Sequence, residues 1–432
     1  MVAVKRILTT HADIAQKEVK TLQDADYHAN VVRYYCQQEH GQFVYIALEM
    51  CPGSLYDIID KPQKFPNLAG RMETRETLRQ ITQGVNHLHS LKIIHRDIKP
   101  QNILVGAPNF RSKHPRLLIS DFGLCKKLQA DEYSFGATTA QGAGTVGWRA
   151  PELLDKAAQE LNDHEHSGSG TATGSEVVED PVTKRRVTRL MDIFPLGCTF
   201  YFVISRGEHP FGTKYNREYN IMFGKSSVHK LVDMEDGGIE AAELVSQMIE
   251  HDPKKRYVEH SPPPPDKTPL SHKNRPDTAT IGADPYFWDA EKKLDFLSHV
   301  SDRFENDKEK MKSEGVISPA LELVTERERD VVGEDWLKKL DPHLYADLTE
   351  KKRRGYDGTR LVDLLRVIRN KRNHFLDMHP AAQRAIGEKP EQFYKYFENR
   401  YANLLMCSYR IAQDAGWYTE TRFAKFRHPP WV

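Results

Sequence analysis

The chain has 432 residues, of which 39% are hydrophobic and 28% are charged, and its formal net charge is +1. This composition is typical of a folded protein with a sizeable core and excludes a chain that is disordered throughout. At roughly 150 residues per domain, the length predicts two or three domains. The charge is uneven, because residues 351–372 contain nine Lys or Arg and two Asp.

The five cysteines are scattered, without a C-x-x-C pair or a metal-ligand spacing, which favours a reducing compartment. The longest uncharged apolar run, residues 193–205, has 13 residues. Because about 20 are needed to cross a bilayer, we expect no membrane-spanning helix here. The N-terminal residues lack the basic and apolar regions of a signal peptide.

The first ninety residues predict strands followed by helices. The opening "MVAVKRI" alternates like a strand, and its abrupt start leads us to expect further sequence upstream. A helix over 13–24 and strands beginning at Val31 and Phe43 follow. Apolar residues at helical spacing then predict a helix that ends near His89, namely Leu78, Ile81, Val85 and Leu88.

Two segments predict inserted surface loops. The region near 156–188 contains a stretch rich in Gly, Ser and Thr, and the region near 259–280 is rich in Pro. Neither composition buries enough apolar surface to offset the entropy of ordering. After Pro285 the sequence changes to charged helices with aromatic anchors, which predicts a domain boundary close to Ala290.

Four short motifs follow one another along the first domain: "VAVK" at 2–5, "HRDIKPQN" at 95–102, "DFG" at 121–123 and "APE" at 150–152. In this order they resemble the signature set of protein kinases. The resemblance implies an α+β two-lobed kinase fold over residues 1–290, with a truncated small lobe at 1–51 and the large lobe at 52–290.

Phosphoryl transfer explains these residue types, because charge spreads over the phosphate oxygens and must be met by cations and a base. The resemblance implies that Asp97 accepts the proton of the attacking hydroxyl and that Lys99 steadies the phosphate. Further roles are implied for residues that bind ATP or ADP and Mg²⁺: Lys5 paired with Glu18 for the phosphates, the backbone of Glu49 and Cys51 for adenine, and Asn102 and Asp121 for the metal.

Other positions predict structural and regulatory roles. Glu152 and Arg256 resemble the ion pair of the large lobe, and Asp192 resembles the carboxylate that braces the catalytic loop. The activation segment of kinases corresponds here to residues 124–147. A phosphate added near Arg96 would order this segment, and we expect phosphorylation at Ser134, Thr138 and Thr139.

The alternative is a pseudokinase, which keeps the fold and has lost the transfer reaction. All of the implied catalytic residues are present, which favours an active kinase. The glycine-rich loop of kinases should precede Val2 and is not in the sequence. We interpret the chain as a fragment, because a small lobe that starts at its third strand would expose an unpaired sheet edge.

A second chemistry is indicated by "RGYDGT" at 354–359 and "LLRVIRNKRNHF" at 364–375. Apolar positions mark one face of a helix over 361–374, namely Leu361, Leu364, Leu365 and Ile368. Asn370 and His374 are four residues apart and share another face, with Arg369 adjacent. Tyr356 lies in a Gly-flanked turn that can fold back beside this helix.

Cutting RNA without metal requires a base for the 2′-hydroxyl, an acid for the departing 5′-oxygen and donors for the phosphate. Histidine, with an ordinary pKa near ~6.5, suits the acid. A tyrosine, with an ordinary pKa of ~10, needs neighbouring cations such as Arg353, Arg354 and Arg369. The basic residues would also attract the RNA backbone. The alternatives are a domain that docks a protein and a scaffold that binds RNA without cutting it.

These motifs resemble the inositol-requiring kinase/endoribonuclease family of the unfolded-protein response. The resemblance implies an all-α ribonuclease domain at 291–432, with Tyr356 as base, His374 as acid, and Arg369 and Asn370 on the scissile phosphate. It also implies homodimers or higher oligomers that phosphorylate one another, and a stem-loop mRNA cut to 2′,3′-cyclic phosphate ends. The location implied is the cytosolic face of the endoplasmic reticulum. The related 2-5A-dependent ribonuclease is a further alternative, which the complete kinase residues disfavour.

Overall fold

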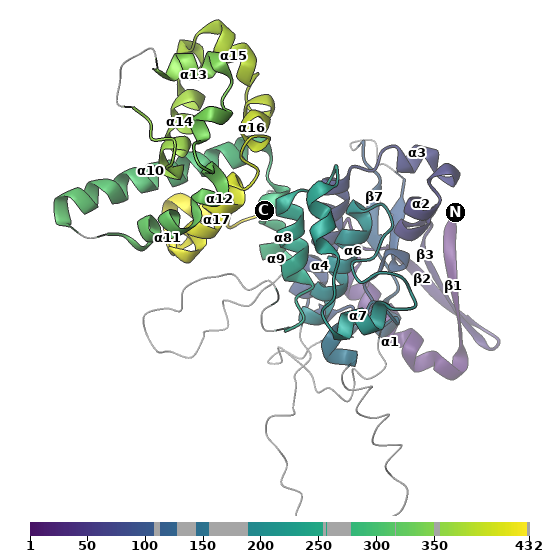
Figure 1. Cartoon of the computed structure of the whole chain (residues 1–432). Coiled ribbons are helices and arrows are strands. Elements are labelled where there is room, and N and C mark those ends of the chain that lie inside the picture. Colours follow the sequence, from purple (N-terminus) through teal and green to yellow (C-terminus); the bar gives the residue numbers. More distant parts are fainter. Residues whose placement is uncertain are drawn as a thin grey trace, which may run out of the picture. The chain divides into compact units, whose positions relative to one another are not determined.

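The computed structural model describes residues 1–107, 113–127, 144–154, 189–253, 256, 278–315, 317–349 and 355–429. These residues divide into two compact units (Figure 1), the first within Met1–Val258 and Arg275–Gly282 and the second mainly within Ala283–Val432. The predicted boundary, Ala290, is the first residue of helix α10, whereas the units divide between Gly282 and Ala283. The predicted loops near 156–188 and 259–280 lie outside the described residues, apart from 278–280 in helix α9.

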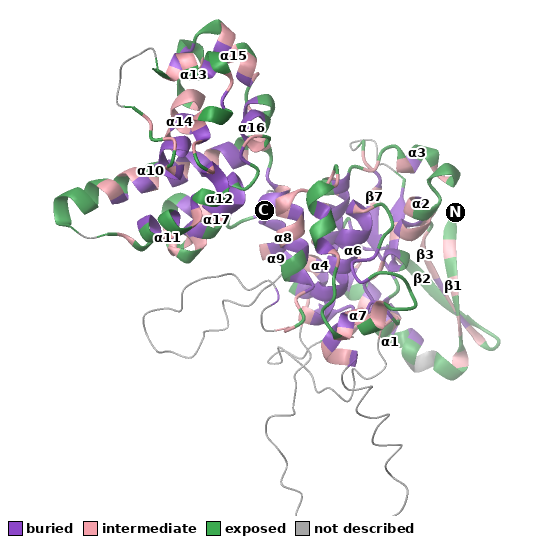
Figure 2. Cartoon of the chain, viewed as in Figure 1, coloured by how far each residue is buried: buried purple, intermediate pink, exposed green. Residues whose placement is uncertain are grey.

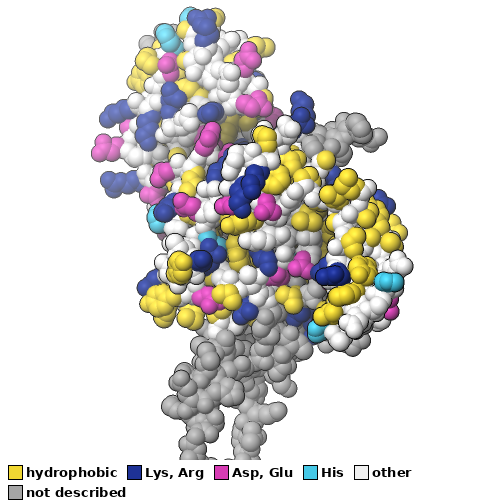
Figure 3. All heavy atoms as spheres, turned by 90° about the vertical axis from the view of Figure 1, so that its right-hand side faces the viewer, with side chains coloured by type: hydrophobic (Ala, Val, Ile, Leu, Met, Phe, Trp, Pro, Cys, Tyr) yellow, Lys and Arg dark blue, Asp and Glu magenta, His cyan; other side chains and the backbone are white. Residues whose placement is uncertain are grey.

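The first unit begins with a small antiparallel sheet of three strands, β1 (Val2–Leu8), β2 (Tyr34–His40) and β3 (Phe43–Glu49), in the order β1-β3-β2. The predicted strand at Val31 starts later, at Tyr34, because Val31 forms only an isolated bridge with Ile119. Alternate residues of β1, including Val4, face outward, and Figure 3 shows hydrophobic side chains on this face of the unit. Helix α1 (Ala12–Ala25) contacts all three strands of this sheet.

The rest of the first unit is built around two helices, α4 (Thr74–Ser90) and α6 (Leu190–Ile204). Helix α4 confirms the predicted apolar stripe, whose members are all buried. Nearly every residue of α6 is buried (Figure 2), so the apolar run seen in the sequence forms a core helix. Smaller helices surround these two: α2 (Leu55–Asp60), α3 (Pro66–Ala69), α7 (Arg217–Met222), α8 (Ile239–Met248) and α9 (Thr278–Gly282).

The first unit contains two further small sheets, made of short strands. One sheet has the order β4 (Gly53–Ser54), β6 (Ile103–Gly106), β7 (Arg116–Ile119), and a second pairs β5 (Ile93–Ile94) with β8 (Lys126–Lys127). The predicted ion pair is present: both Nη atoms of fully buried Arg256 donate to Glu152, at 2.7 and 2.6 Å. The expected two-lobed α+β fold is confirmed.

The described part of the second unit is helical throughout. Its helices are α10 (Ala290–Glu314), α11 (Pro319–Arg327), α12 (Arg329–Val332), α13 (Pro342–Thr349), α14 (Leu361–Asn373), α15 (Pro380–Ile386), α16 (Glu391–Glu398) and α17 (Leu404–Asp414). Helix α14 packs along α10, and the four apolar residues predicted for its inner face are fully buried. The all-α second domain is therefore confirmed.

None of the helices within the described ranges is long and apolar enough to span a membrane.

Candidate active sites

Lys5 joins the small sheet to helix α1 and to the loop after β7. Its Nζ lies 2.6 Å from Oε1 of buried Glu18 and 2.8 Å from Oδ1 of Asp121. Burial opposes the charge on Lys5, but the carboxylates of Glu18 and Asp121 outweigh it and raise the pKa of the ammonium group. The predicted lysine–glutamate pair is therefore formed, and the cation is held charged.

Asp97 is held from several sides in the turn after β5. Lys99 Nζ lies 2.7 Å from its Oδ2, and Asn102 Nδ2 donates to the same oxygen at 2.8 Å. The backbone N–H and the hydroxyl of Thr145 donate to Oδ1, at 2.9 and 2.7 Å. Burial favours the neutral acid, but the hydrogen bonds from Lys99 and Thr145 prevail and lower the pKa of Asp97. The carboxylate is thus ionised and fixed in orientation.

The backbone of the loop that contains Asp97 is held in place by hydrogen bonds to Asp192. This buried carboxylate accepts the backbone N–H groups of His95 and Arg96, both at 2.8 Å, and contacts Nε2 of His89 at 2.9 Å. Arg96 has a φ of 68°, a left-handed conformation that costs energy in a residue with a side chain. Asp192 stabilises that conformation, as the sequence predicts.

Asn102 and Asp121, the residues predicted to bind the metal, carry side-chain oxygens of the kind that a divalent cation binds. The Asn102 amide nitrogen donates to the backbone oxygen and the carboxylate of Asp97, so its Oδ1 is the atom that could act as a metal ligand. Asp121 has a φ of 64°, and its carboxylate is half exposed. Hard divalent cations prefer such oxygen ligands. Within the described ranges no group of three or more His, Cys, Asp and Glu could hold a metal.

The predicted adenine contacts lie at the end of β3. Glu49 is its last residue, and the Glu49 N–H donates to the carbonyl of Arg33 at 2.9 Å. Its side chain pairs with Arg116 at 3.2 Å. Burial, with a smaller contribution from Glu49, raises the pKa of the Cys51 thiol to about 11, so Cys51 is neutral at physiological pH.

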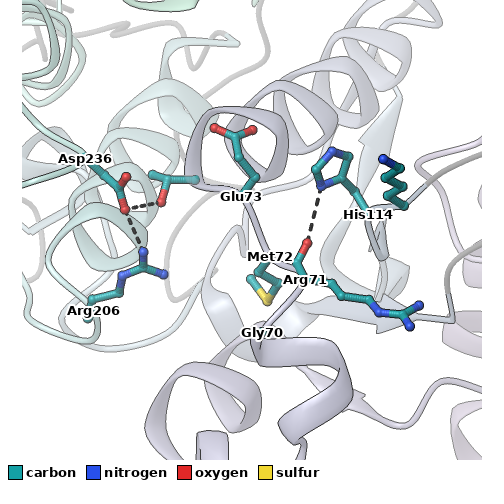
Figure 4. A pocket seen from close by; sticks show the side chains of 9 residues that line it. Gly70, Arg71, Met72, Glu73, His114, Arg206 and Asp236 are labelled. Carbon is teal, nitrogen blue, oxygen red and sulfur yellow. Dashed lines mark hydrogen bonds and ion pairs between the residues drawn. The ribbon is translucent and has the colours of Figure 1, made fainter.

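A separate cavity of about 340 Å³ lies away from this chemistry (Figure 4). Asp236 accepts the hydroxyl of Thr74 and a guanidinium N–H of Arg206, both at 2.6 Å, and His114 contacts the carbonyl of Arg71. None of the predicted catalytic residues lines this cavity.

In the second unit, the turn that carries Tyr356 folds back against α14 as expected. Asn370 Nδ2 lies 3.5 Å from the Tyr356 hydroxyl, and the Arg366 guanidinium lies over the phenol ring, 4.8 Å from its centre. The turn is fixed by the Asp357 N–H, which donates to Asp363 at 2.7 Å. These contacts bring the predicted base beside the predicted phosphate-binding amide.

Arg369 and His374 extend this cluster along α14. Arg369 Nη2 donates to Oδ1 of Asn370 at 3.3 Å, and its Nη1 lies 2.6 Å from Asp302. His374 is the C-cap of the helix, and its N–H donates to the Asn370 carbonyl at 2.9 Å. The His374 side chain is 69% exposed, with Nδ1 at 3.2 Å from Oδ2 of Asp377. Direct side-chain contacts join Tyr356, Asn370 and Arg369, and His374 follows one turn later.

Three residues of these sites were not assigned their roles from the sequence: Thr145, Asp363 and Arg366. The position of Arg366, four residues before Asn370, is the signal that could have identified it. The predicted phosphorylation sites Ser134, Thr138 and Thr139 and the cations Arg353 and Arg354 lie outside the described residues.

Comparison with known protein families gives one match in each of the two units. Residues 1–261 match the family model for the protein kinase domain, and residues 293–427 match the model named Ribonuclease 2-5A. Since the first match covers more than half of the chain, this chain belongs to the protein kinase family.

Relatives that match almost the whole of this chain include proteins named as both kinase and endoribonuclease. The chain is 42% identical to the serine/threonine-protein kinase/endoribonuclease ireA of Aspergillus fumigatus, over 99% of this chain and 37% of the relative. It is 39% identical to the sensor for unfolded proteins in the ER ire1 of Schizosaccharomyces pombe, over 98% and 36% of the two chains. For human serine/threonine-protein kinase/endoribonuclease IRE2 the identity is 34%, over 99% and 40%.

The resemblance to the kinase/endoribonuclease family is thereby confirmed, and the names of these relatives favour it over the 2-5A-dependent ribonuclease. The chain spans a little over a third of the length of the curated relatives that it matches.

Proposed function

We propose that this chain is a bifunctional enzyme, a serine/threonine protein kinase that phosphorylates copies of itself and an endoribonuclease that cuts stem-loop mRNA in the unfolded-protein response. The observation that carries the proposal is the presence of two separate constellations, one around Asp97 and one around Tyr356 and Asn370.

In the kinase reaction, Asp97 orients the attacking hydroxyl and accepts its proton, since this carboxylate is ionised and held by four donors. Lys99, bonded to both Asp97 and Thr145, places a positive charge where the phosphoryl group passes. Protein kinases use ATP and a divalent cation, and Mg²⁺ is the cation proposed here. Asn102 and Asp121 would hold it, and Lys5 would bind the nucleotide phosphates, where the metal supplies charge neutralisation.

In RNA cleavage, Tyr356 takes the proton of the 2′-hydroxyl and His374 protonates the 5′-oxygen that leaves. Arg369 and Asn370 donate hydrogen bonds to the phosphate as its charge grows. The 2′-oxygen attacks the neighbouring phosphorus, so the products carry a 2′,3′-cyclic phosphate and a 5′-hydroxyl. This scheme requires no metal ion.

The active form proposed is a homodimer or higher oligomer at the cytosolic face of the endoplasmic reticulum membrane. A cluster of this size is small for a folded RNA, which favours a site shared between copies. Cleavage per protomer should therefore rise with protein concentration over the range in which dimers form. A constant rate per protomer across that range would contradict shared assembly.

A labelled RNA stem-loop incubated in EDTA tests the nuclease directly. Cleavage with cyclic phosphate ends supports it. Binding without cleavage supports an RNA-binding scaffold, and absence of both supports a docking domain. For the kinase, the mass of the activation segment after incubation with ATP and Mg²⁺ separates an active kinase, which gains phosphate, from a pseudokinase, which does not.

A further inference from the structure

Arg366 is a charged residue of α14 for which the proposed reaction has no role so far. Its guanidinium carbon lies 4.8 Å from the centre of the Tyr356 ring. Its Nη2 lies 3.4 Å from Oδ1 of Asp363, and the side chain is only 20% exposed. The guanidinium is therefore held between a carboxylate and an aromatic face, where a cation–π contact is stronger than in open solvent.

Asp363 links this cation to the turn that carries the phenol. The carboxylate is buried, and its Oδ2 accepts the N–H of Asp357, the residue after Tyr356, at 2.7 Å. Its Oδ1 faces Arg366 and, at 3.9 Å, Lys308 of α10. One buried carboxylate thus fixes both the backbone beside Tyr356 and the guanidinium over its ring.

The Tyr356 ring is consequently fixed on three sides. Arg366 covers its face, Trp336 lies edge-on with ring centres 6.3 Å apart, and the Asn370 amide lies 3.5 Å from its hydroxyl. Trp336 is fully buried, so it provides a rigid wall. Arg366 is the charged member of this enclosure.

We propose that Arg366, held by Asp363, is a positioning residue that fixes the Tyr356 phenol in its reactive orientation during RNA cleavage. This inference rests on the proposed nuclease function. The placement of a base controls the rate, since a displacement of about 1 Å can cost about 10²-fold. A planar guanidinium stacks on a ring as an ammonium group cannot, so arginine is preferred to lysine here.

Two substitutions test the role under single-turnover and steady-state conditions, with a labelled RNA stem-loop as substrate. Arg366→Met keeps the stem and removes the charge, and we expect kcat to fall by roughly 10- to 100-fold while KM changes by less than about threefold. Arg366→Lys keeps the charge but cannot stack as a plane on the ring, so its kcat should lie between those of Arg366→Met and the wild type. The matched control, Arg384→Met, removes an exposed cation of α15 and should leave kcat unchanged.

A double-mutant cycle with Tyr356→Phe shows whether Arg366 acts through the phenol. If it does, adding Arg366→Met to Tyr356→Phe lowers the residual rate by less than about twofold. Losses that multiply would overturn the inference, and so would a raised KM with an unchanged kcat, which marks a general RNA-binding cation. Melting temperature and autophosphorylation of the same samples report folding, and a fall in kcat that only follows the loss of folded protein would also overturn it.

The nuclease function and the positioning role of Arg366 can be told apart by the way each would fail. If wild-type protein does not cut the stem-loop, the nuclease function and the role of Arg366 fall together. If Tyr356→Phe is impaired and Arg366→Met is not, only the positioning role is lost.

Discussion

The two proposed active sites differ in how firmly the fold holds their side chains. Asp97 of the kinase site is 6% exposed and receives hydrogen bonds from Lys99, Asn102 and Thr145. His374 of the nuclease site is 69% exposed, and its side-chain partner, Asp377, is exposed as well. The proposed kinase base is thus fixed by buried contacts, whereas the proposed general acid of the nuclease site lies exposed at the end of α14, where a folded RNA can reach it.

This difference has a chemical reason. Phosphoryl transfer needs several charges arranged around a small nucleotide, and a buried, preorganised carboxylate serves it well. RNA cleavage needs an acid and a base beside one linkage of a bulky substrate, so these groups must stay accessible. The comparison predicts that each site can be disabled without the other.

The largest effect is expected for Asp97→Ala, which removes the base and the acceptor of four hydrogen bonds. Autophosphorylation should fall below detection, seen as unphosphorylated mass at the activation segment, while stem-loop cleavage persists. Loss of both activities in a variant with an unchanged melting temperature would break the separation of the two sites.

His374→Ala should lower RNA cleavage by about 10²- to 10⁴-fold, the range for loss of a general acid. Because the side chain is exposed, the melting temperature and autophosphorylation should be unchanged. A loss of less than tenfold in a gel assay of labelled stem-loop would remove His374 from the acid role.

Two glycines, Gly355 and Gly358, lie on either side of Tyr356. Replacing each by alanine gives a matched pair of variants, with smaller expected effects on cleavage than His374→Ala. A Cβ at Gly358 would clash with the carboxylate of Asp335, whereas a Cβ at Gly355 would meet open space. Gly358→Ala should therefore destabilise the second unit by roughly 2 kcal/mol and reduce cleavage, because the turn moves. Gly355→Ala should change neither urea unfolding nor cleavage. Equal effects of the two would show that the turn does not position Tyr356.

The smallest expected effect is on the pH dependence of the folding stability of the first unit. His28 and His87 stack with ring centres 4.5 Å apart, and burial followed by the charge of His87 lowers the pKa of His28 to about 4. The unfolded chain then binds more protons than the folded one between pH ~6.5 and about 4, so stability present above pH ~6.5 is lost as the pH falls through this window.

Replacing the ring tests this pH dependence. His28→Gln should flatten the decline in stability by about 1 kcal/mol or less, because the ring is partly exposed and solvent screens it. Urea unfolding of wild type and variant at pH 7 and pH 5 measures it. An identical pH slope in the two proteins would exclude His28 as the source.

The sequence predicted the elements whose pattern is local. The alternation of "MVAVKRI", the stripe of α4 and the inner face of α14 were confirmed because burial follows strand and helix periodicity. The start of β2 was placed three residues early, because Val31 is buried and forms only an isolated bridge with Ile119, so its apolar character did not mark the start of the strand.

Such local patterns do not predict contacts between residues that are far apart in the sequence. No spacing indicates that Thr145 donates to Asp97, 48 residues earlier. Helical spacing places Arg366 on the same side of α14 as Asn370, but it does not show that the guanidinium stacks on the ring of Tyr356. Both depend on how the chain returns on itself in three dimensions. The exposure of His374 was equally hidden, because its place at the C-cap of α14 is decided by where the helix ends.

The most direct test of the acid–base account uses an RNA stem-loop in which sulfur replaces the 5′-oxygen that leaves. Sulfur departs without protonation, so we expect His374→Ala to cut this substrate at nearly the wild-type rate, while Tyr356→Phe remains impaired. A His374→Ala enzyme as slow on the sulfur substrate as on ordinary RNA would contradict the assignment of His374 as the general acid.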